Sequence, residues 1–146
     1  MRVVLQRVSR AEVRVDGTVV GAIGSGLCLF LGIHLDDTPA HADWMAEKCL
    51  DLRIFPSRPE GVGDLSVRDS GGGVLVVSQF TLYGDTRKGR RPAFTSSAPP
   101  ETARKLYEYF IERIEASGVA TGSGVFGAMM AVDLVNDGPY TLILER

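Results

Sequence analysis

Residues 26–33 read GLCLFLGI, an apolar run that carries no charged side chain at any position. Side chains alternate between the two faces of a strand, so a run that is apolar throughout is typical of a strand buried on both faces. The run is far shorter than the roughly 18 residues of a membrane-spanning helix. It predicts the central strand of a sheet, around which the remaining elements are arranged.

The segments before and after this run also carry strand patterns. Aliphatic side chains bounded by turn residues predict strands over residues 1–8, 11–15, 18–23, 74–77, 129–135 and 140–144. Asp16-Gly17 is a type I′ hairpin signal, and residues 136–139 are predicted to be the turn between the last two strands. Residues 56–63, which are rich in Gly and Pro, are predicted to be a loop.

Two helices are predicted from their first turns and apolar stripes. Thr38-Pro39 combines an N-cap with a first-turn proline, Pro99-Pro100 opens the second helix, and Gly118 ends it. The stripes consist of Ala42, Met45, Ala46, Cys49 and Leu50, and of Ala103, Leu106, Tyr107, Phe110, Ile111 and Ile114. Because these helices do not alternate regularly with the strands, the pattern favours a β-rich α+β fold over a βαβ fold.

Length and composition limit the class of protein. A chain of 146 residues with 45% hydrophobic residues is expected to form one globular domain, residues 1–146, without disulfide support. The N-terminus lacks the features of a signal peptide, and Cys28 and Cys49 lie within apolar patterns, so we expect reduced thiols in a cytoplasmic protein with no membrane contact. The formal net charge of -2 argues against a general nucleic-acid coat, DNA included, but allows a local basic patch.

Several familiar motifs are absent or lack their context. Residues 122–127 match a dinucleotide-binding glycine pattern but precede a predicted strand rather than a helix, and residues 84–91 lack the Lys and Ser/Thr of a P-loop. The two histidines, His34 and His41, do not have metal-site spacing, and no nucleophile elbow is present. We therefore expect no metal and no cofactor, and a hydrolase with a histidine base is hard to build.

Three polar segments and one arginine remain to be explained. Residues 78–82 place two hydroxyls and an amide directly after a buried strand, where backbone N–H groups could form an oxyanion hole. Residues 136–141 read as a reverse turn, and the basic residues 87–91 are the best candidate for phosphate contact. Arg7 shares a strand face with Val3 and Leu5. It therefore either lies at a sheet margin or reaches a buried acceptor, and the first alternative is favoured on general grounds.

Together these segments resemble the D-aminoacyl-tRNA deacylase family. Residues 78–82 look like the first signature of that family, and residues 136–139 followed by Thr141 look like its second, the Gly-cisPro motif. Residues 5–8, 85–94 and 126–128 also match, so the likeness covers nearly the whole chain.

The resemblance implies a compact, barrel-like homodimer that hydrolyses the ester between a D-amino acid and the 3′-terminal adenosine of tRNA. It implies a catalytic set of Ser78, Gln79, Phe80 and Thr81. It also implies that the Gly138 and Pro139 carbonyls enter the pocket of the partner subunit, where they receive the substrate α-amino group. Arg7 is expected to hold this Gly-Pro segment, and Phe126, Met129 and Met130 are expected to line the pocket. The loop residues Arg87, Lys88, Arg90 and Arg91 are expected to contact tRNA phosphates.

One departure keeps alternatives open. Most of the family has Val after the Gly-Pro pair, whereas this chain has Tyr140. A related deacylase that clears L-alanine from tRNA has an aromatic residue there, so an L-alanyl-tRNA proofreader is one alternative, and non-catalytic modules that bind tRNA or another ligand are others. For the chemistry, either Thr81 is a nucleophile or the adenosine 2′-OH assists the attack; the second suits a histidine-poor site better.

Overall fold

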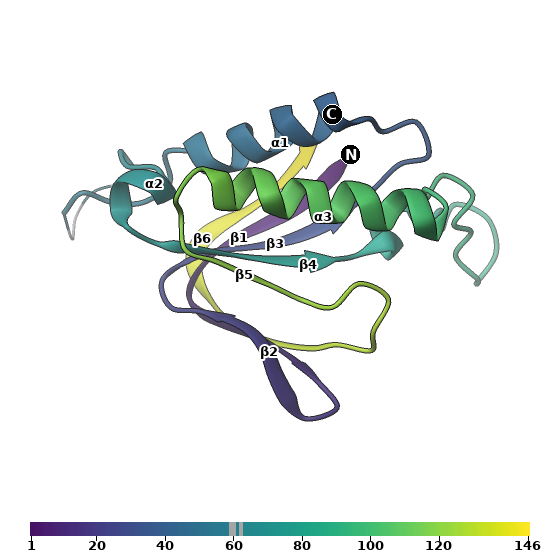
Figure 1. The fold of residues 1–146 in the computed structure, drawn as a ribbon, viewed down its shortest axis with the longest axis horizontal. Helices are drawn as coiled ribbons and strands as arrows, with labels where there is room; N and C mark the ends of the chain where they lie inside the picture. The colour runs from purple at the N-terminus through teal and green to yellow at the C-terminus, as the bar shows by residue number, and fades with distance from the viewer. Residues whose placement is uncertain (59–60, 62) are drawn as a thin grey trace.

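The fold is a strongly curved six-stranded sheet with helices on one face. In the computed structural model, which describes residues 1–58, 61 and 63–146, the strand order is β2-β1-β3-β4-β5, and β6 pairs with β1. The strands are β1 (Arg2–Val15), β2 (Thr18–Ile23), β3 (Gly26–Gly32), β4 (Gly73–Ser78), β5 (Thr121–Ser123) and β6 (Ala131–Glu145). β1 is antiparallel to β2, β3 and β6, whereas β3, β4 and β5 run parallel (Figure 1).

Two close approaches explain how the sheet curves toward a barrel. A side chain at Gly21 in β2 would overlap the backbone of Ser123 in β5, so the two ends of the sheet lie against each other. A side chain at Gly26 in β3 would overlap the backbone of Gly73 in β4. The chain is therefore compact, β-rich and nearly closed, as predicted.

The predicted central strand and the two long helices are confirmed. β3 lies between β1 and β4, and every apolar side chain of the strand except Phe30 is buried. Helices α1 (Pro39–Asp51) and α3 (Pro100–Ala116) lie on one face of the sheet and bury most of their predicted apolar stripes against it (Figure 1). Among the described residues, no helix has the length and apolar character that crossing a bilayer requires.

The structure corrects some expected boundaries. The turn predicted over residues 136–139 is wrong, because β6 continues through it as one strand and pairs with β1 on both sides. Residues 1–8 and 11–15 likewise form a single strand, β1. Strand β5 and the one-turn helix α2 (Val67–Ser70) were not expected. The predicted loop over residues 56–63 falls partly outside the described residues.

Candidate active site

A cavity of about 480 Å³ lies where β4 ends. Its wall brings together six of the predicted site residues: Ser78, Gln79, Phe80, Phe126, Met129 and Met130. The sequence did not indicate the remaining lining residues, which are Val77, Ser97, Ala98, Pro100, Ala103, Gly127, Ala128 and Val132. None of these described lining residues carries a charge, and none is a histidine. The cavity is therefore neutral, with hydroxyl and amide groups on an otherwise apolar wall.

The polar edge of the cavity forms because the backbone leaves the sheet after Ser78. The Gln79 N–H still donates to the Leu31 carbonyl at 2.8 Å, and the chain then turns into the short 3₁₀ helix η1 (Phe80–Tyr83). The first N–H groups of such a helix have no acceptor within it, so the amides of Phe80 and Thr81 are available to a ligand. An oxyanion hole would thus use these two amides rather than that of Gln79.

Thr81 lies beside the cavity rather than in its lining. Its Oγ1 accepts a hydrogen bond from the Gln79 side-chain amide, and the residue is exposed. Because Gln79 uses an acceptor site of this hydroxyl, the hydroxyl proton remains available for donation to a ligand. No base is seen to accept that proton among the contacts recorded for the described residues.

The lining segment around Phe126 is held by a buried tyrosine, Tyr107, that sequence patterning assigned only to the core. The Tyr107 hydroxyl in α3 donates to the carbonyls of Val76 and Gly124, at 2.9 and 3.2 Å. Burial raises the pKa of Tyr107 to about 12, which keeps the phenol protonated as the donor. The Tyr107 ring packs 5.7 Å from that of Phe126, and Gly124 leaves room for the Met130 sulfur, which would lie 2.5 Å from an added Cβ. Tyr107 therefore ties α3, β4 and the lining segment together.

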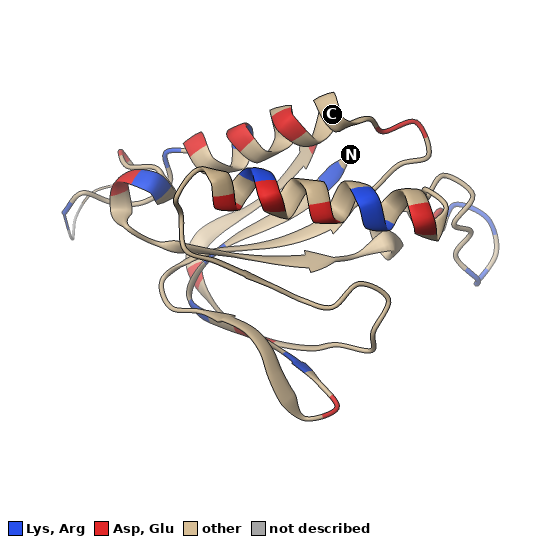
Figure 2. Ribbon diagram, viewed as in Figure 1, with Lys and Arg blue, Asp and Glu red and all other residues tan. Residues whose placement is uncertain are grey.

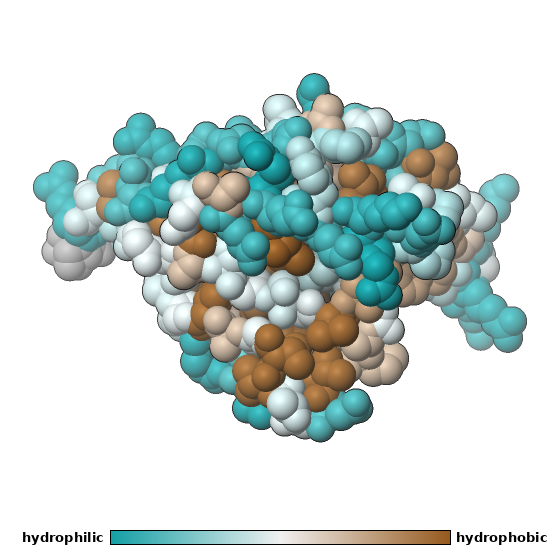
Figure 3. Space-filling view, viewed as in Figure 1, coloured by the Kyte–Doolittle hydropathy of each residue, from teal (hydrophilic) through white to brown (hydrophobic). Residues whose placement is uncertain are grey.

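The cavity rim carries large apolar side chains that face solvent. Phe80 is 58% exposed and packs 5.0 Å from Phe94, and Met129 is 90% exposed. Figure 3 shows apolar side chains gathered over the lower part of one face, where β2 and the segment leading to β6 lie. Val19 and Val20 in β2 are also exposed. An apolar surface of this kind marks a site of interaction rather than ordinary surface.

Arg7 is buried and bonded to the Gly-Pro segment, so the sheet-margin alternative is wrong and the buried-acceptor alternative, which the resemblance also implied, is correct. Its side chain is 9% exposed, and Nε donates to the Asp137 carbonyl at 3.2 Å while Nη2 donates to the Gly138 carbonyl at 2.9 Å. Nη1 donates to the Ile54 carbonyl, and Nε also pairs with the Asp137 carboxylate at 2.9 Å. One guanidinium therefore connects the Gly-Pro segment to the loop after α1.

The Gly138-Pro139 segment is a wide bulge in β6. Arg7 alone, between the paired positions Gln6 and Val8, lies opposite residues 137–140. The Gly138–Pro139 peptide bond is cis, and the segment is exposed. It does not line the cavity. Arg7, which it faces, pairs with Leu27, and Leu27 pairs with Val74 near the start of β4, whereas the cavity lies at the end of that strand. Within one chain, the two predicted halves of the site therefore do not meet.

Tyr140, the departure from the family pattern, points inward. Its ring lies under the Arg7 guanidinium, 4.8 Å from the guanidinium carbon to the ring centroid. Its hydroxyl lies 3.1 Å from the position that a Cβ on Gly63 would take. The ring therefore packs against its own chain, beneath the exposed Gly-Pro segment.

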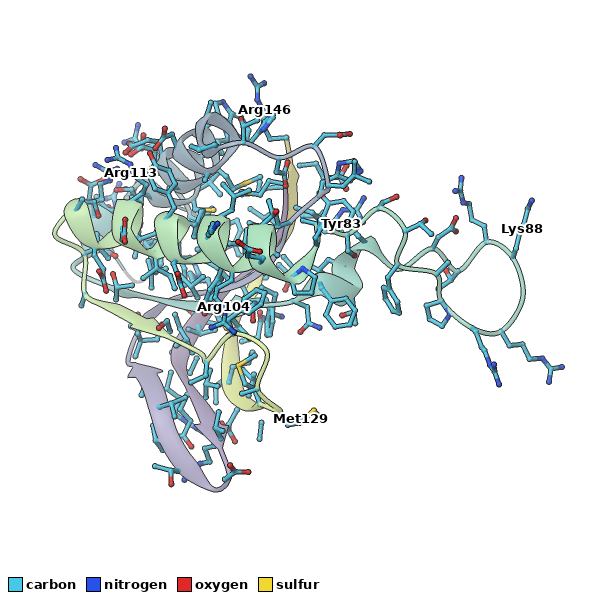
Figure 4. All side chains as sticks on the ribbon, turned by 45° about the vertical axis from the view of Figure 1, so that its right-hand side comes forward. Tyr83, Lys88, Arg104, Arg113, Met129 and Arg146 are labelled. Atoms are coloured by element: carbon cyan, nitrogen blue, oxygen red, sulfur yellow. The ribbon has the colours of Figure 1, made fainter. Side chains whose placement is uncertain are left out.

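The basic loop projects from the body of the molecule and holds the exposed side chains of Lys88, Arg90 and Arg91 (Figures 2 and 4). Arg87 is instead engaged by Asp85 through two contacts, at 2.9 and 2.7 Å. The Arg87 hydrogen bonds lower the pKa of Asp85 to about 2, so this carboxylate stays charged. Three of the four predicted phosphate contacts therefore remain unengaged in the recorded contacts of the described residues.

The histidines and metal-binding residue types lie away from this cavity. His34 packs its ring 5.2 Å from Tyr83, and His41 Nδ1 accepts from the Thr38 backbone N–H at the start of α1. In the described part of the chain, no three His, Cys, Asp or Glu side chains cluster closely enough to hold a metal ion.

Comparisons with known proteins agree with this geometry. The family model described as D-Tyr-tRNA(Tyr) deacylase matches residues 4–145. Proteins named D-aminoacyl-tRNA deacylase from Trichodesmium erythraeum (strain IMS101) and Koribacter versatilis (strain Ellin345) are 52% and 55% identical, over 100% and 99% of this chain and 97% of each relative. A solved structure described as the c-Myc DNA unwinding element binding protein has a TM-score of 0.90 at 41% identity, covering 100% of this chain and 99% of its own. A second, described as a probable eukaryotic D-amino acid tRNA deacylase, has a TM-score of 0.86 at 20% identity, covers 98% of this chain and 97% of its own, and supports the fold alone. The chain belongs to the D-Tyr-tRNA(Tyr) deacylase family.

Proposed function

We propose that this protein hydrolyses the ester that joins a D-amino acid to the 3′-terminal adenosine of tRNA, which removes wrongly charged D-amino acids from translation. The observation that carries the proposal is the neutral cavity at the end of β4, which is lined by Phe80, the first residue of η1. Water adds to the ester carbonyl, the bond to the ribose oxygen breaks, and the products are a free D-amino acid and tRNA with a free hydroxyl.

The chemistry requires stabilisation of the tetrahedral intermediate more than a strong base, because an aminoacyl ester is already activated. One oxyanion-hole donor contributes roughly 2.7–4 kcal/mol to transition-state stabilisation, and the Phe80 and Thr81 amides are suited to this role. Since no lining histidine is available, the adenosine 2′-OH is the proposed assistant for attack. Thr81 then positions the substrate by donating its hydroxyl proton.

Selection against L-amino acids is proposed to come from the Gly138 and Pro139 carbonyls of a second copy of the chain. These carbonyls would receive the α-ammonium of a D-substrate in the neutral cavity, and an L-substrate would place another group there. Rejection by a clash or by an unpaired polar group discriminates more strongly than apolar fit, which gives only about 1–3 kcal/mol. Because backbone carbonyls ignore the substrate side chain, many D-amino acids, and also achiral glycine, are expected to be accepted.

The proposed homodimer follows from the separation of the two half-sites and from the apolar surface near them. Mixed dimers provide a sharp test. A variant blocked in the cavity by Ala103→Trp and a variant with Gly138→Val are each expected to be inactive. After subunit exchange, about half of the dimers are mixed and each has one intact site, so about a quarter of the wild-type sites are expected to return. Failure to regain activity in verified mixed dimers would contradict a shared site.

The basic loop is proposed to contact acceptor-stem phosphates. With a handful of contacts, the salt dependence of binding should be shallow, with a log–log slope of about -2 to -4. Replacement of Lys88, Arg90 and Arg91 by Ser is expected to flatten the slope, whereas Arg10→Ser, an exposed arginine of β1, serves as the matched control. A slope that is unchanged by the triple replacement would remove this role from the loop.

The decisive experiment compares deacylation of D-Tyr-tRNA, L-Tyr-tRNA and L-Ala-tRNA by the purified protein. Rapid loss of only the D ester is the expected result. Loss of L-Ala-tRNA instead would support the L-alanyl alternative that Tyr140 suggests. Survival of all three esters while tRNA still binds would leave a non-catalytic tRNA-binding module.

A further inference from the structure

The neutral cavity has a guanidinium at its rim. Arg104 lies on α3, next to the lining residue Ala103, and its guanidinium carbon is 5.0 Å from the ring centroid of Phe126, another lining residue. In Figure 4, Arg104 extends from α3 toward the loop that carries Met129, whereas Arg113 lies toward the other end of the same helix. Arg104 is thus placed to meet a ligand that enters the cavity.

The three basic residues of α3 differ in how they are engaged. Lys105 pairs with Glu101 at 2.9 Å, and Arg113 pairs with Asp43 at 2.9 Å. Among the recorded contacts of the described residues, Arg104 has only the stacking on Phe126. An exposed guanidinium that contacts only the face of an aromatic ring has no hydrogen-bond acceptor, so its fork of N–H donors can bind an anion in bidentate fashion.

We propose that Arg104 binds the phosphate attached to the 5′ side of the 3′-terminal nucleotide of the substrate. This inference rests on the proposed function and adds a phosphate site distinct from the basic loop. The ester in the cavity is carried by the ribose of that nucleotide, so its own phosphate must lie within one nucleotide of the cavity, at the rim. The projecting basic loop is better placed for phosphates further along the strand (Figure 4). Arg104 is accordingly a binding residue that fixes the depth to which the terminal nucleotide enters.

The test uses two small substrates that differ only in this phosphate: the 3′-O-D-tyrosyl esters of adenosine and of adenosine 5′-monophosphate. For Arg104→Gln, kcat/KM on the phosphorylated ester is expected to fall roughly tenfold to a hundredfold, the range for a hydrogen-bonded charge pair, mainly through KM. Its kcat/KM on the adenosine ester should stay within about twofold of wild type. Arg104→Lys keeps the charge but not the planar fork, so its kcat/KM on the phosphorylated ester should lie between those of wild type and Arg104→Gln.

Arg113→Gln is the matched control, and it is expected to leave both esters unaffected. Two outcomes would overturn the assignment: equal losses on both esters, which would indicate that Arg104 acts only by packing on Phe126, or no loss on either. Binding of uncharged tRNA, measured in parallel, separates this inference from the proposed function. If wild type cleaves no ester, the deacylase proposal fails. In that case weaker tRNA binding by Arg104→Gln than by wild type and Arg113→Gln would still support the phosphate site, whereas equal tRNA binding by all three proteins would overturn it.

Discussion

Replacing Arg7 with Lys tests how the Gly-Pro segment is held. The arginine fork donates to three backbone carbonyls at once, those of Ile54, Asp137 and Gly138, and its side chain is only 9% exposed. A lysine ammonium is a compact donor on a flexible stem and cannot span three carbonyls that lie in different directions. We expect it to keep one of these hydrogen bonds and to lose two.

The size of the effect follows from what becomes unpaired. A buried acceptor left without a partner costs roughly 1–3 kcal/mol. Of the three contacts only the one to Ile54 is buried, whereas those to Asp137 and Gly138 are partly buried and water can replace them, so we expect a loss of about 1–3 kcal/mol. The Asp137 carboxylate adds little to this, because its side chain is 51% exposed and water can replace the arginine. A domain of this kind is stable by about 5–15 kcal/mol, so the variant should remain folded at 25 °C.

The assay is urea unfolding of wild type, Arg7→Lys and the control Arg10→Lys. Arg10 is also in β1, but its pair with Asp133 is exposed on both sides, so its replacement should change the free energy of unfolding by less than about 0.5 kcal/mol. Arg7→Lys should in addition lower the ratio of D-Tyr-tRNA to L-Tyr-tRNA hydrolysis, because the Gly138 carbonyl is no longer fixed. An Arg7→Lys variant that matches the Arg10 control in stability and keeps wild-type chiral selectivity would refute this reasoning.

Three further measurements address the chemistry, the sheet and the buried thiols. Thr81→Ala should keep much of the wild-type kcat/KM; complete loss in a folded variant would return Thr81 to the role of nucleophile. Gly26→Ala should lower the free energy of unfolding by about 3 kcal/mol or more, because the added methyl group overlaps the backbone of β4. In the control Gly24→Ala the methyl group meets no atom within 4 Å, so the free energy of unfolding should change little. Similar values for the two variants would contradict the close approach of β3 and β4. Burial raises the pKa of Cys28 and Cys49 from 9.0 to about 12, so both stay neutral in the folded chain and ionise near pH 9 when it unfolds. The contribution of the two neutral thiols to stability is therefore fully present below pH 9 and is lost between pH 9 and 12. The decline should be smaller after Cys49→Ala, and an equal decline would exclude the Cys49 thiol as one of its causes.

Much of the fold could be predicted because its signals are local. An apolar run gave the central strand, and cap residues with 3.6-residue periodicity gave α1 and α3. The bulge at residues 136–139 could not be separated from a turn, because Asn, Asp, Gly and Pro suit either one, and only pairing with β1 on both sides distinguishes them. β5 is three residues long and contains Gly122, so it carries too little pattern to be recognised.

The candidate site could be predicted from the sequence only where a recognisable polar motif directly follows the end of a predicted strand. Residues 78–81 mark the polar edge of the cavity, but its remaining wall depends on how the first turn of α3 packs across β4, which no local pattern encodes. Tyr107 belongs to an apolar stripe, and its hydrogen bonds to Val76 and Gly124 become visible only after the helix is docked. Arg7 is the opposite case: its environment looked like a sheet margin because the carbonyls it binds lie 47 to 131 residues away in sequence.

The neutrality of the cavity bears on why a second copy of the chain would be required. A D-aminoacyl ester brings an α-ammonium group into a space whose described lining residues offer no carboxylate. An ammonium moved out of water needs several acceptors, and this lining offers only a few hydroxyl and amide oxygens, so additional acceptors from a second copy would stabilise it. Gly138 is an exposed residue whose carbonyl is held by Arg7, and it does not line the cavity of its own chain, which is what such an acceptor from a partner requires. A carboxylate in its place would attract the ammonium of L- and D-substrates alike over several ångströms, whereas a fixed neutral carbonyl binds it only at hydrogen-bond distance and in one direction. Chiral selectivity in the proposed dimer would thus depend on the absence of charge in the cavity as much as on the position of the Gly-Pro carbonyls.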